Sequence, residues 1–400
     1  MSYTVGLDWG SKQHLVCVLN ETGGVKKRFT VEHSREGLER LLRELRKIAP
    51  PQELPVAIER PSGVLVDTLL EAEHPVIPIH PNVVKASRSR YRANSSKSDP
   101  HDAYLLADLL RTDAHRFTPL SPLSDEMRAI RTLARARDEM VRQRVMLSNQ
   151  LLAVLERAWP GGAAIFADLA SPIALAFLER YPTSSSARTL GEKRLAAFLV
   201  KHHYSGRKSA SELLARLKSA PHSTIGEHEE EATREIVLSL VCALNAVVGR
   251  LNPLTRALEH ASASTAMGRL VMSFPRTGRL NAAQIVAELG DDPNRFTSRD
   301  HLASEAGVAP VTHASGKSRG VTSRYACNKR LKRALTTWAN NSRHADPWAA
   351  RIYQHARARG CRHPHATRIL AKAWTRILHA CWRNGTPYDP TITNHQPTMG

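Results

Sequence analysis

Apolar residues recur at two spacings in the first 120 residues, and these spacings predict a sheet covered by helices. Alternation is typical of strands, and a period of three to four residues is typical of amphipathic helices. In chain order the expected elements are strands at 3–8, 14–20 and 25–31, a helix at 34–48, a strand at 55–59, a helix at 62–73, a strand at 75–81 and a helix from Asp99. This succession predicts an α/β layer with a mixed sheet, in the order of the ribonuclease H-like fold.

Long helical periods replace this pattern after residue 124. Residues 125–159 contain neither glycine nor proline and predict one long helix. A second long helix is expected from about Glu229, with a heptad seam formed by Leu240, Leu244, Val247, Leu251, Leu254 and Leu258. Pro253 lies inside this seam and should kink or break the helix. A helical hairpin and a dimerising coiled coil fit the pattern equally well.

The changes of pattern predict a division of the chain into domains. We expect an α/β domain at 1–120, a helical coiled-coil middle at 121–264, a mostly α C-terminal domain at 265–390 and a tail at 391–400. A chain of 400 residues is long enough for two or three domains, each with a core of its own.

The charge of the chain predicts a polyanionic partner. There are 57 Lys and Arg against 37 Asp and Glu, a formal net charge of +20. From residue 306 to residue 400 sixteen Lys or Arg face two acids, Asp346 and Asp389, a local net charge of +14. Binding to nucleic acid is favoured by such a surplus because neutralising phosphates releases their counterions. Nucleic acid is therefore the expected partner.

Cysteine usage and hydropathy indicate a soluble protein of a reducing, cytoplasmic compartment. The five cysteines are widely spaced and form no CxxC pair. Cys361, His363 and His365 lie close together, but their spacing matches no known zinc site, so ordinary core and surface roles are favoured. The N-terminus has no signal-peptide pattern, and the longest apolar region, residues 236–249, is too short and interrupted to span a bilayer. We therefore expect no membrane association.

Four acids are placed where they can converge. Asp8 ends the first strand, Glu59 ends the fourth, and Asp99 and Asp102 lie three residues apart at the start of a helix. In this topology the first and fourth strands are neighbours, and a spacing of three puts both helix acids on one face. The alternative is a purely local role, in which Asp99 is the N-cap of the helix and Asp102 is an acid of the first turn that favours the helix dipole. Four acids that converge repel one another unless cations lie between them. Their joint placement in a basic protein therefore favours Mg²⁺ or Mn²⁺ bound between the four carboxylates.

At these residues the sequence resembles a known family. GLDWGSKQH, VAIERPSG and NSSKSDPHDAYLLADLLR resemble the RuvC-like N-terminal domain of the DEDD-type transposases of bacterial insertion sequences, the insertion sequence 110 family, which is related to the Piv invertases. The resemblance implies that Asp8, Glu59, Asp99 and Asp102 are the catalytic, metal-binding tetrad. GLDWGS alone also resembles actin-like sugar kinases, but no second glycine-rich nucleotide loop is present.

The resemblance also implies a serine nucleophile in the C-terminal domain. The loop GVAPVTHASGKSRG places it at Ser315; from the residues alone Ser318 and Ser323 are equally eligible, and the loop is a basic phosphate-binding loop. Upstream, FPRTGRLNAAQIVAELGDDPNRF resembles the family's helix-hairpin-helix-like element, with Arg276 where a glycine is usual. We expect nucleic-acid contacts from Lys85, Arg88, Arg90, Arg92, Lys97, Gly316, Lys317, Arg319, Arg324, Lys329, Arg330, Lys332 and Arg333.

The expected function is a DNA transposase or recombinase that cuts and rejoins DNA through this serine. The resemblance further implies double-stranded DNA of the element ends and target as partner, guidance by a structured non-coding (bridge) RNA, a homodimer or homotetramer, and a bacterial cytoplasmic location at the nucleoid. Two alternatives stay open. One is a metal-dependent junction nuclease of the RuvC type without a covalent intermediate, and the other is a non-catalytic nucleic-acid-binding protein whose acids are helix caps.

Overall fold

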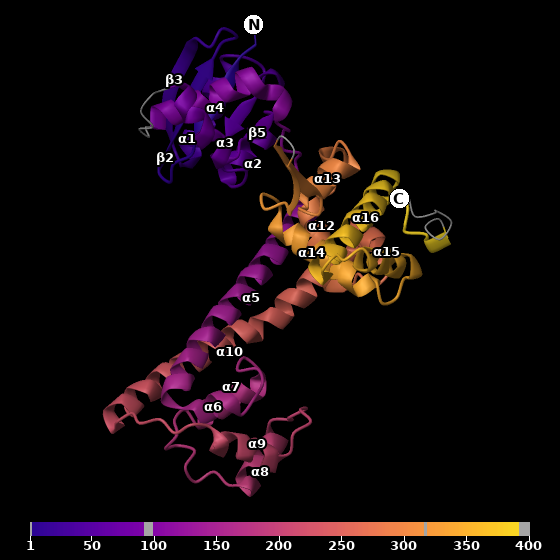
Figure 1. Ribbon diagram of the computed structural model, residues 1–400. Coiled ribbons are helices and arrows are strands. Elements are labelled where there is room, and N and C mark those ends of the chain that lie inside the picture. Colours follow the sequence, from indigo (N-terminus) through magenta and orange to yellow (C-terminus); the bar gives the residue numbers. More distant parts are fainter. Residues whose placement is uncertain (1, 92–98, 316–317, 392–400) are drawn as a thin grey trace. The chain divides into compact units, whose positions relative to one another are not determined.

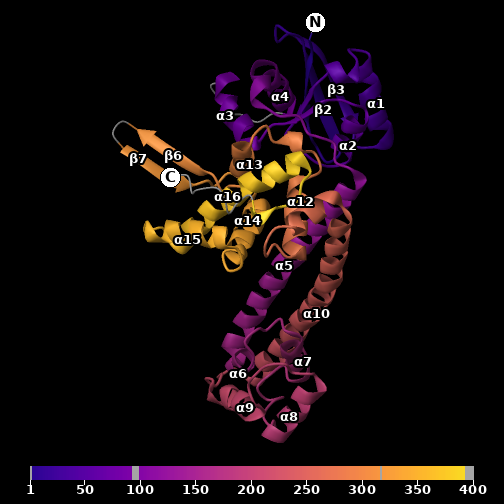
Figure 2. The same ribbon diagram turned by 90° about the vertical axis from the view of Figure 1, so that its right-hand side faces the viewer.

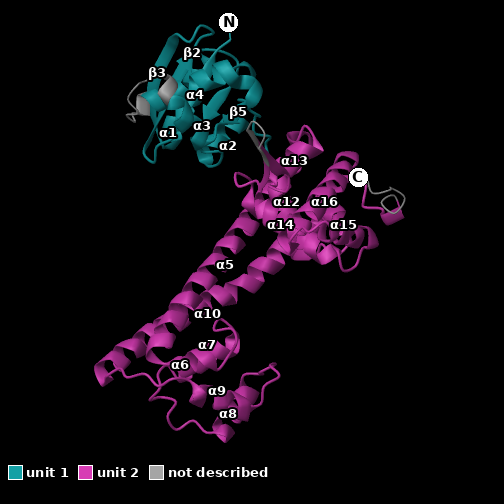
Figure 3. Cartoon of the chain, viewed as in Figure 1, with its two compact units in different colours: residues 1–123 teal, residues 124–400 magenta. Residues whose placement is uncertain are grey.

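A computed structural model describes residues 2–91, 99–315 and 318–391, and at 89–91, 99–100, 314–315 and 318–319 it describes the backbone alone. The chain forms two compact units, residues 1–123 and residues 124–400 (Figure 3). Each unit has its own hydrophobic core. The boundary at residue 123 lies close to the expected end of the first domain, and the finer division of the remainder stays a prediction.

The elements of the two units are shown in Figure 1. The N-terminal unit contains β1 (Thr4–Asp8), β2 (Gln13–Leu19), β3 (Val25–Glu32), α1 (Arg35–Arg46), η1 (Pro51–Glu53), β4 (Val56–Ile58), α2 (Val64–Glu71), β5 (Val76–Pro78), α3 (Pro81–Tyr91), α4 (Asp99–Asp113) and η2 (Ala114–Arg116). The C-terminal unit contains α5 (Asp125–Ala158), α6 (Pro160–Ala164), α7 (Pro172–Arg180), α8 (Glu192–Lys201), α9 (Ala210–Ser219), α10 (Glu227–Ser264), α11 (Ala266–Met272), α12 (Arg279–Leu289), η3 (Pro293–Arg295), α13 (Arg299–Glu305), β6 (Pro310–Ser315), β7 (Ser318–Ser323), α14 (Lys329–Ser342), α15 (Pro347–Ala358) and α16 (His363–Asn384).

The sheet of the N-terminal unit has the order β3-β2-β1-β4-β5. β1 pairs antiparallel with β2 and parallel with β4, so the first and fourth strands are neighbours as expected. This mixed sheet confirms the ribonuclease H-like architecture of the unit. Helix α3 was not foreseen, because only one of its described side chains, Val84, is fully buried and its basic sequence shows no clear apolar period.

Helices cover both faces of the sheet. Leu7 and Ile58 point to the face where α1 and α2 pack, and Gly6 and Ala57 point to the opposite face, where α4 packs. This alternation follows from the pleat of a strand, in which successive side chains point to opposite faces. The same alternation decides on which face of the sheet the side chains of Asp8 and Glu59 lie.

Helices α5 and α10 run side by side in both views (Figures 1 and 2). Their ends near Leu155 and Val241 enclose a core with α6–α9. The structure thus shows an intramolecular helix pair, and the coiled-coil geometry stays a prediction. α10 does not break at Pro253. The ring removes the partner of the Gly249 carbonyl four residues earlier, but both positions are exposed, so water can satisfy that carbonyl.

Helix α10 bears on the expectation that no segment of the chain spans a membrane. Its 38 residues make it long and apolar enough to cross a membrane by length and composition alone, because the helix extends well beyond the apolar run at 236–249. In the chain it begins with a cluster of glutamates and packs along α5 through Val237, Val241 and other buried residues. Length and composition therefore give only weak support for a membrane span.

Candidate functional site

The carboxyl ends of β1 and β4 bring two acids together. Leu7 lies opposite Ile58 in the parallel pair, so Asp8 and Glu59 are the next residues on adjacent strands. The pleat places both acids on the same side of the sheet as Gly6 and Ala57, which is the side that α4 covers. Both carboxylates are half-buried. The expected juxtaposition of these two acids is therefore consistent with the strand register.

Helix α4 runs over β1 in the opposite direction, so its first turn lies toward the strand's carboxyl end. Thr4 Oγ1 donates to the Ala107 carbonyl at 3.0 Å. A Cβ placed on Gly6 would lie only 2.0 Å from the Ala103 carbonyl oxygen. Moving two residues along the strand thus moves four residues back along the helix. By the same spacing, Asp8, two residues further along the strand, is expected opposite the first turn of α4, which begins at Asp99.

Asp102 is the best-defined carboxylate of this region. Its side chain is 4% exposed, and Oδ2 accepts a hydrogen bond from Arg88 Nη2 at 3.0 Å. Within the described part of the chain, Asp102 Oδ1 and Arg88 Nε are buried without a hydrogen-bond partner. A buried carboxylate oxygen without a donor is costly. The structure places the guanidinium of Arg88 against Asp102, and the expected contact of Arg88 with nucleic acid stays a prediction.

The donor set of this region fits a hard divalent cation. Carboxylate oxygens are the ligands that Mg²⁺ and Mn²⁺ prefer, and the orphaned Asp102 Oδ1 offers one. Among the side chains that the structure describes, no three acids, histidines or cysteines form a ready-made metal cluster. The side chain of Asp99 lies outside the described residues. The four-acid site therefore stays a prediction.

A buried histidine supports the loop that follows β1. His14 is fully buried, and its Nε2 lies 2.9 Å from His33 Nδ1. Its Nδ1 accepts a weak hydrogen bond from the Gly10 amide at 3.4 Å. The pKa of His14 is lowered to about 4, chiefly by burial and also by the charge of the neighbouring His33. The neutral imidazole therefore braces the loop beside Asp8 at physiological pH.

The expected serine lies on a β-hairpin of the C-terminal unit. Ser315 ends β6 and pairs in register with Ser318 at the start of β7. Gly316 and Lys317, between them, lie outside the described residues, as do the side chains of Ser315 and Arg319. The role of Ser315 stays a prediction.

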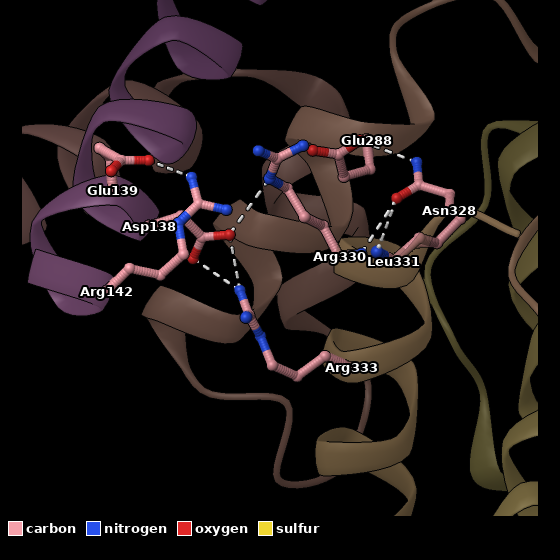
Figure 4. A network of polar contacts seen from close by, with 8 residues as sticks. All are labelled: Asp138, Glu139, Arg142, Glu288, Asn328, Arg330, Leu331 and Arg333. Atoms are coloured by element: carbon pink, nitrogen blue, oxygen red, sulfur yellow. Dashed lines mark hydrogen bonds and ion pairs between the residues drawn. The ribbon is translucent and has the colours of Figure 1, made fainter. Parts of the chain in front are cut away.

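Two basic residues of α14 are held by an acid from α5 (Figure 4). Arg333 Nη2 donates to Asp138 Oδ1 at 2.6 Å and Oδ2 at 2.7 Å, and Arg330 Nε donates to Asp138 Oδ2 at 3.2 Å. Asp138 is buried, whereas the Arg333 side chain is 57% exposed. One carboxylate thus anchors two guanidinium groups that still reach solvent. Sequence reasoning did not identify Asp138, because a single acid within a long helix carries no local signal.

The other expected nucleic-acid residues are differently placed. Lys329 lies over the Tyr325 ring at 4.6 Å, and Lys332 Nζ donates to the Arg324 carbonyl at 2.9 Å. Lys85 is exposed on α3. Arg92, Lys97 and the side chain of Arg90 lie outside the described residues.

The turn between α11 and α12 contains two residues with a positive φ. Arg276, which stands where a glycine is usual, has a φ of 54°, and Gly278 has a φ of 72°. The Pro275 carbonyl accepts a hydrogen bond from Trp338 Nε1 at 3.1 Å, which ties the turn to α14. Arg276 therefore carries backbone strain that a glycine at this position would avoid.

Comparisons with known proteins agree with the resemblance. A family model described as "Transposase", for the DEDD-type transposases of IS110, matches residues 5–160, and one described as "Transposase IS116/IS110/IS902 family" matches residues 268–354. The chain is 33% identical to the protein of Streptomyces coelicolor assigned as the transposase of the mini-circle IS117, over 96% of this chain and 94% of that protein. It is 28% identical to a 42 kDa protein of the insertion element IS900 of Mycobacterium paratuberculosis, over 97% of each.

One solved structure shows a weak likeness. The RuvC protein of T. thermophilus, determined in complex with a Holliday junction substrate, is 19% identical over 30% of this chain and 100% of its own, with a TM-score of 0.23. That likeness is too low to bear on the fold or the function.

Proposed function

Because the chain belongs to the IS116/IS110/IS902 family of insertion-sequence transposases, whose members cut and rejoin DNA, we propose that it does so through Ser315 and a divalent-metal site formed by Asp8, Glu59, Asp99 and Asp102. The observation that carries this proposal is the crossing of α4 over β1. It brings the first turn of α4 toward the carboxyl ends of the two strands that carry Asp8 and Glu59.

The covalent step conserves the phosphodiester energy. The Ser315 hydroxyl attacks a DNA phosphorus, an Oγ–P bond forms, the bond from phosphorus to one sugar oxygen breaks, and the serine proton passes to that leaving oxygen. A sugar hydroxyl then reverses the step on the new partner strand and releases the serine. Because one ester bond replaces another at each stage, no nucleotide triphosphate is needed.

Residues of this chain would bind and orient the reacting groups. The four acids would hold Mg²⁺ or Mn²⁺, which when bound supplies positive charge that stabilises the leaving oxygen. Arg88 keeps Asp102 oriented, and the basic side chains of Arg324, Arg330 and Arg333 would neutralise DNA phosphates. The proposed serine and the four acids lie in different units of the chain.

The partners follow from the same proposal. Double-stranded DNA of the element ends and target is the substrate, and a structured non-coding RNA encoded in the element is the guide. A homodimer or homotetramer would hold two DNA partners, in the bacterial cytoplasm at the nucleoid. The net charge of +20 supports a nucleic-acid partner of either kind.

A covalent-adduct assay tests the mechanism. Purified protein, the element's RNA and end-labelled junction DNA are incubated with Mg²⁺, denatured and separated on a gel, alongside Ser315→Ala and Asp102→Ala. We expect a protein–DNA adduct that both substitutions abolish. Ser323→Ala, a second serine of the same hairpin, is the matched control and should keep the adduct. Free cut DNA that persists in Ser315→Ala would instead support the metal-dependent nuclease, and absence of any cleavage would support a binding protein.

Occupancy of the metal site can be measured without activity. Mn²⁺ should raise the melting temperature of the wild-type chain, because binding only to the folded state stabilises it. Asp8→Asn should lose this shift, while Asp67→Asn, an acid in the first turn of α2, should keep it. An equal shift in both variants would contradict the proposed site.

A further inference from the structure

Three arginines line one hollow at the turn between α15 and α16. Arg359, Arg362 and Arg368 surround a hollow of about 440 Å³ together with His365, Cys361 and neighbouring backbone. Arg359, Arg362 and His365 are exposed, and Arg368 is half-buried. None of the residues that line this hollow belongs to the β6–β7 hairpin or to α14, where the sequence predicted the nucleic-acid contacts of this unit.

The turn that carries these side chains is held in a defined conformation. Gly360 has a φ of 85°, and the Cys361 amide donates to the Ala356 carbonyl at 3.1 Å, which closes the end of α15. Arg357 Nη1 donates to the Cys361 carbonyl at 3.1 Å, and the Tyr353 hydroxyl lies 2.8 Å from His363 Nδ1. These hydrogen bonds fix the backbone that carries the three arginines.

No acid compensates the charge of this region. Residues 347–387 contain eight Lys or Arg and no Asp or Glu. Within the described part of the chain, none of the three arginines makes an ion pair, whereas Arg330 and Arg333 of α14 are both paired with Asp138. Uncompensated guanidinium groups around one hollow attract an anion that offers several charges at short spacing.

We propose that the hollow formed by Arg359, Arg362 and Arg368 is a second nucleic-acid contact, which binds the phosphodiester backbone of DNA or RNA. Guanidinium groups match phosphate oxygens bidentately, and a backbone brings consecutive phosphates to neighbouring arginines. The amino end of α16, which begins at His363 and has no side-chain cap, adds partial positive charge to the same side. This inference rests on the proposed function and deepens it by giving it a binding surface built from other residues than those of the serine hairpin.

Binding without chemistry tests the surface. The dissociation constants of the full chain for a 30-base-pair duplex and for a structured RNA of equal length are measured by fluorescence anisotropy at several salt concentrations, without metal. The triple substitution Arg359→Ala, Arg362→Ala and Arg368→Ala is compared with a charge-matched control. The control replaces three exposed basic residues of the α7–α9 region, Arg188, Lys193 and Arg207, with alanine. Circular dichroism verifies that both variants fold.

The α15–α16 variant should bind at least one of the two probes about tenfold more weakly. Its salt slope should fall by about 2 to 3, since each of the three lost phosphate contacts removes about 0.7 to 0.9 from the slope. The control should change affinity less than threefold. The probe that loses affinity identifies DNA or RNA as the source of the backbone. Replacement of the same three arginines by lysine should restore most of the binding.

Two results would overturn the proposal. Equal weakening of both triple variants would show a general effect of net charge, and unchanged binding of the α15–α16 variant would show that the hollow makes no contact. Wild-type protein that binds neither probe would count against the proposed function as a whole. Wild-type protein that binds while the variant is unaffected counts only against this surface.

Discussion

Gly6 lies where α4 packs closely on β1, and its replacement by alanine should disrupt the candidate site by displacing that helix. The added Cβ would lie 2.0 Å from the Ala103 carbonyl oxygen and 2.4 Å from the Ala107 amide nitrogen. A carbon and a carbonyl oxygen normally approach to about 3.3 Å. Helix α4 would therefore have to retreat by about 1.3 Å. Both clashing atoms are backbone, so no rotamer change relieves the overlap.

The displacement of α4 should lower the stability of the chain through two contributions. Overpacking of a close-packed core costs about 1–3 kcal/mol, and the hydrogen bond from Thr4 to the Ala107 carbonyl, 3.0 Å long, would contribute about 1 kcal/mol more when it lengthens. We expect Gly6→Ala to lower the free energy of unfolding by about 3 kcal/mol. Because α4 carries Asp99 and Asp102, a shift near 1 Å should also weaken DNA cleavage about a hundredfold.

Urea denaturation and hydrogen exchange measure these effects separately. The exchange of amides in peptides from β1 and α4 should accelerate, while peptides from α14 and α16 should not change. Gly249→Ala is the matched control, because no described atom lies within 4 Å of its Cβ and alanine in a helix interior should gain about 1 kcal/mol. If Gly6→Ala unfolds at the same urea concentration as the wild type and exchanges at the same rate, the close contact of α4 with β1 is refuted.

Three further predictions test single side chains. Arg88→Ala should lower the free energy of unfolding in urea by about 3 kcal/mol, because it leaves the buried carboxylate of Asp102 unpaired. Arg88→Lys should lower it less. Equal losses in the two variants would argue against the ion pair. Asp138→Ala should lower the free energy of unfolding by about 1–3 kcal/mol. It leaves the exposed Arg333 free, so binding to duplex DNA should not weaken. A variant as stable as the wild type would show that the α5–α14 contact does not depend on this acid. His14 has a lowered pKa of about 4, so the unfolded chain binds its proton first and stability falls as the pH drops from 6.5 toward 4. Between pH 7 and pH 5 the wild type should lose about 2 kcal/mol more than His14→Gln, and parallel pH profiles would contradict this assignment.

Much of the N-terminal unit could be predicted from the sequence, because local patterns encode its elements. Alternation and helical periodicity identified every strand of the five-stranded sheet, and the order of elements implied that β1 and β4 are neighbours. The placement of Asp8 and Glu59 at strand ends follows from the same reasoning. Helix α3 was missed because its basic surface carries no apolar period.

The composition determined the kind of partner but not where it binds. A net charge of +20 indicates nucleic acid whatever the fold. Which arginines are available depends on their neighbours, and these come from distant parts of the chain. Arg333 meets Asp138 across 195 residues, while Arg359, Arg362 and Arg368 meet no acid within the described residues. Nothing in the local sequence separates the two groups.

Tertiary structure alone decided how the candidate site is held. The sequence shows a glycine in β1 and an alanine in α4, but only packing shows that the helix backbone rests on Gly6. It likewise shows that Arg88 holds Asp102 and that α10 continues past Pro253. These features depend on contacts between residues far apart in the chain or on access to water, whereas periodicity and charge record only what each segment prefers by itself.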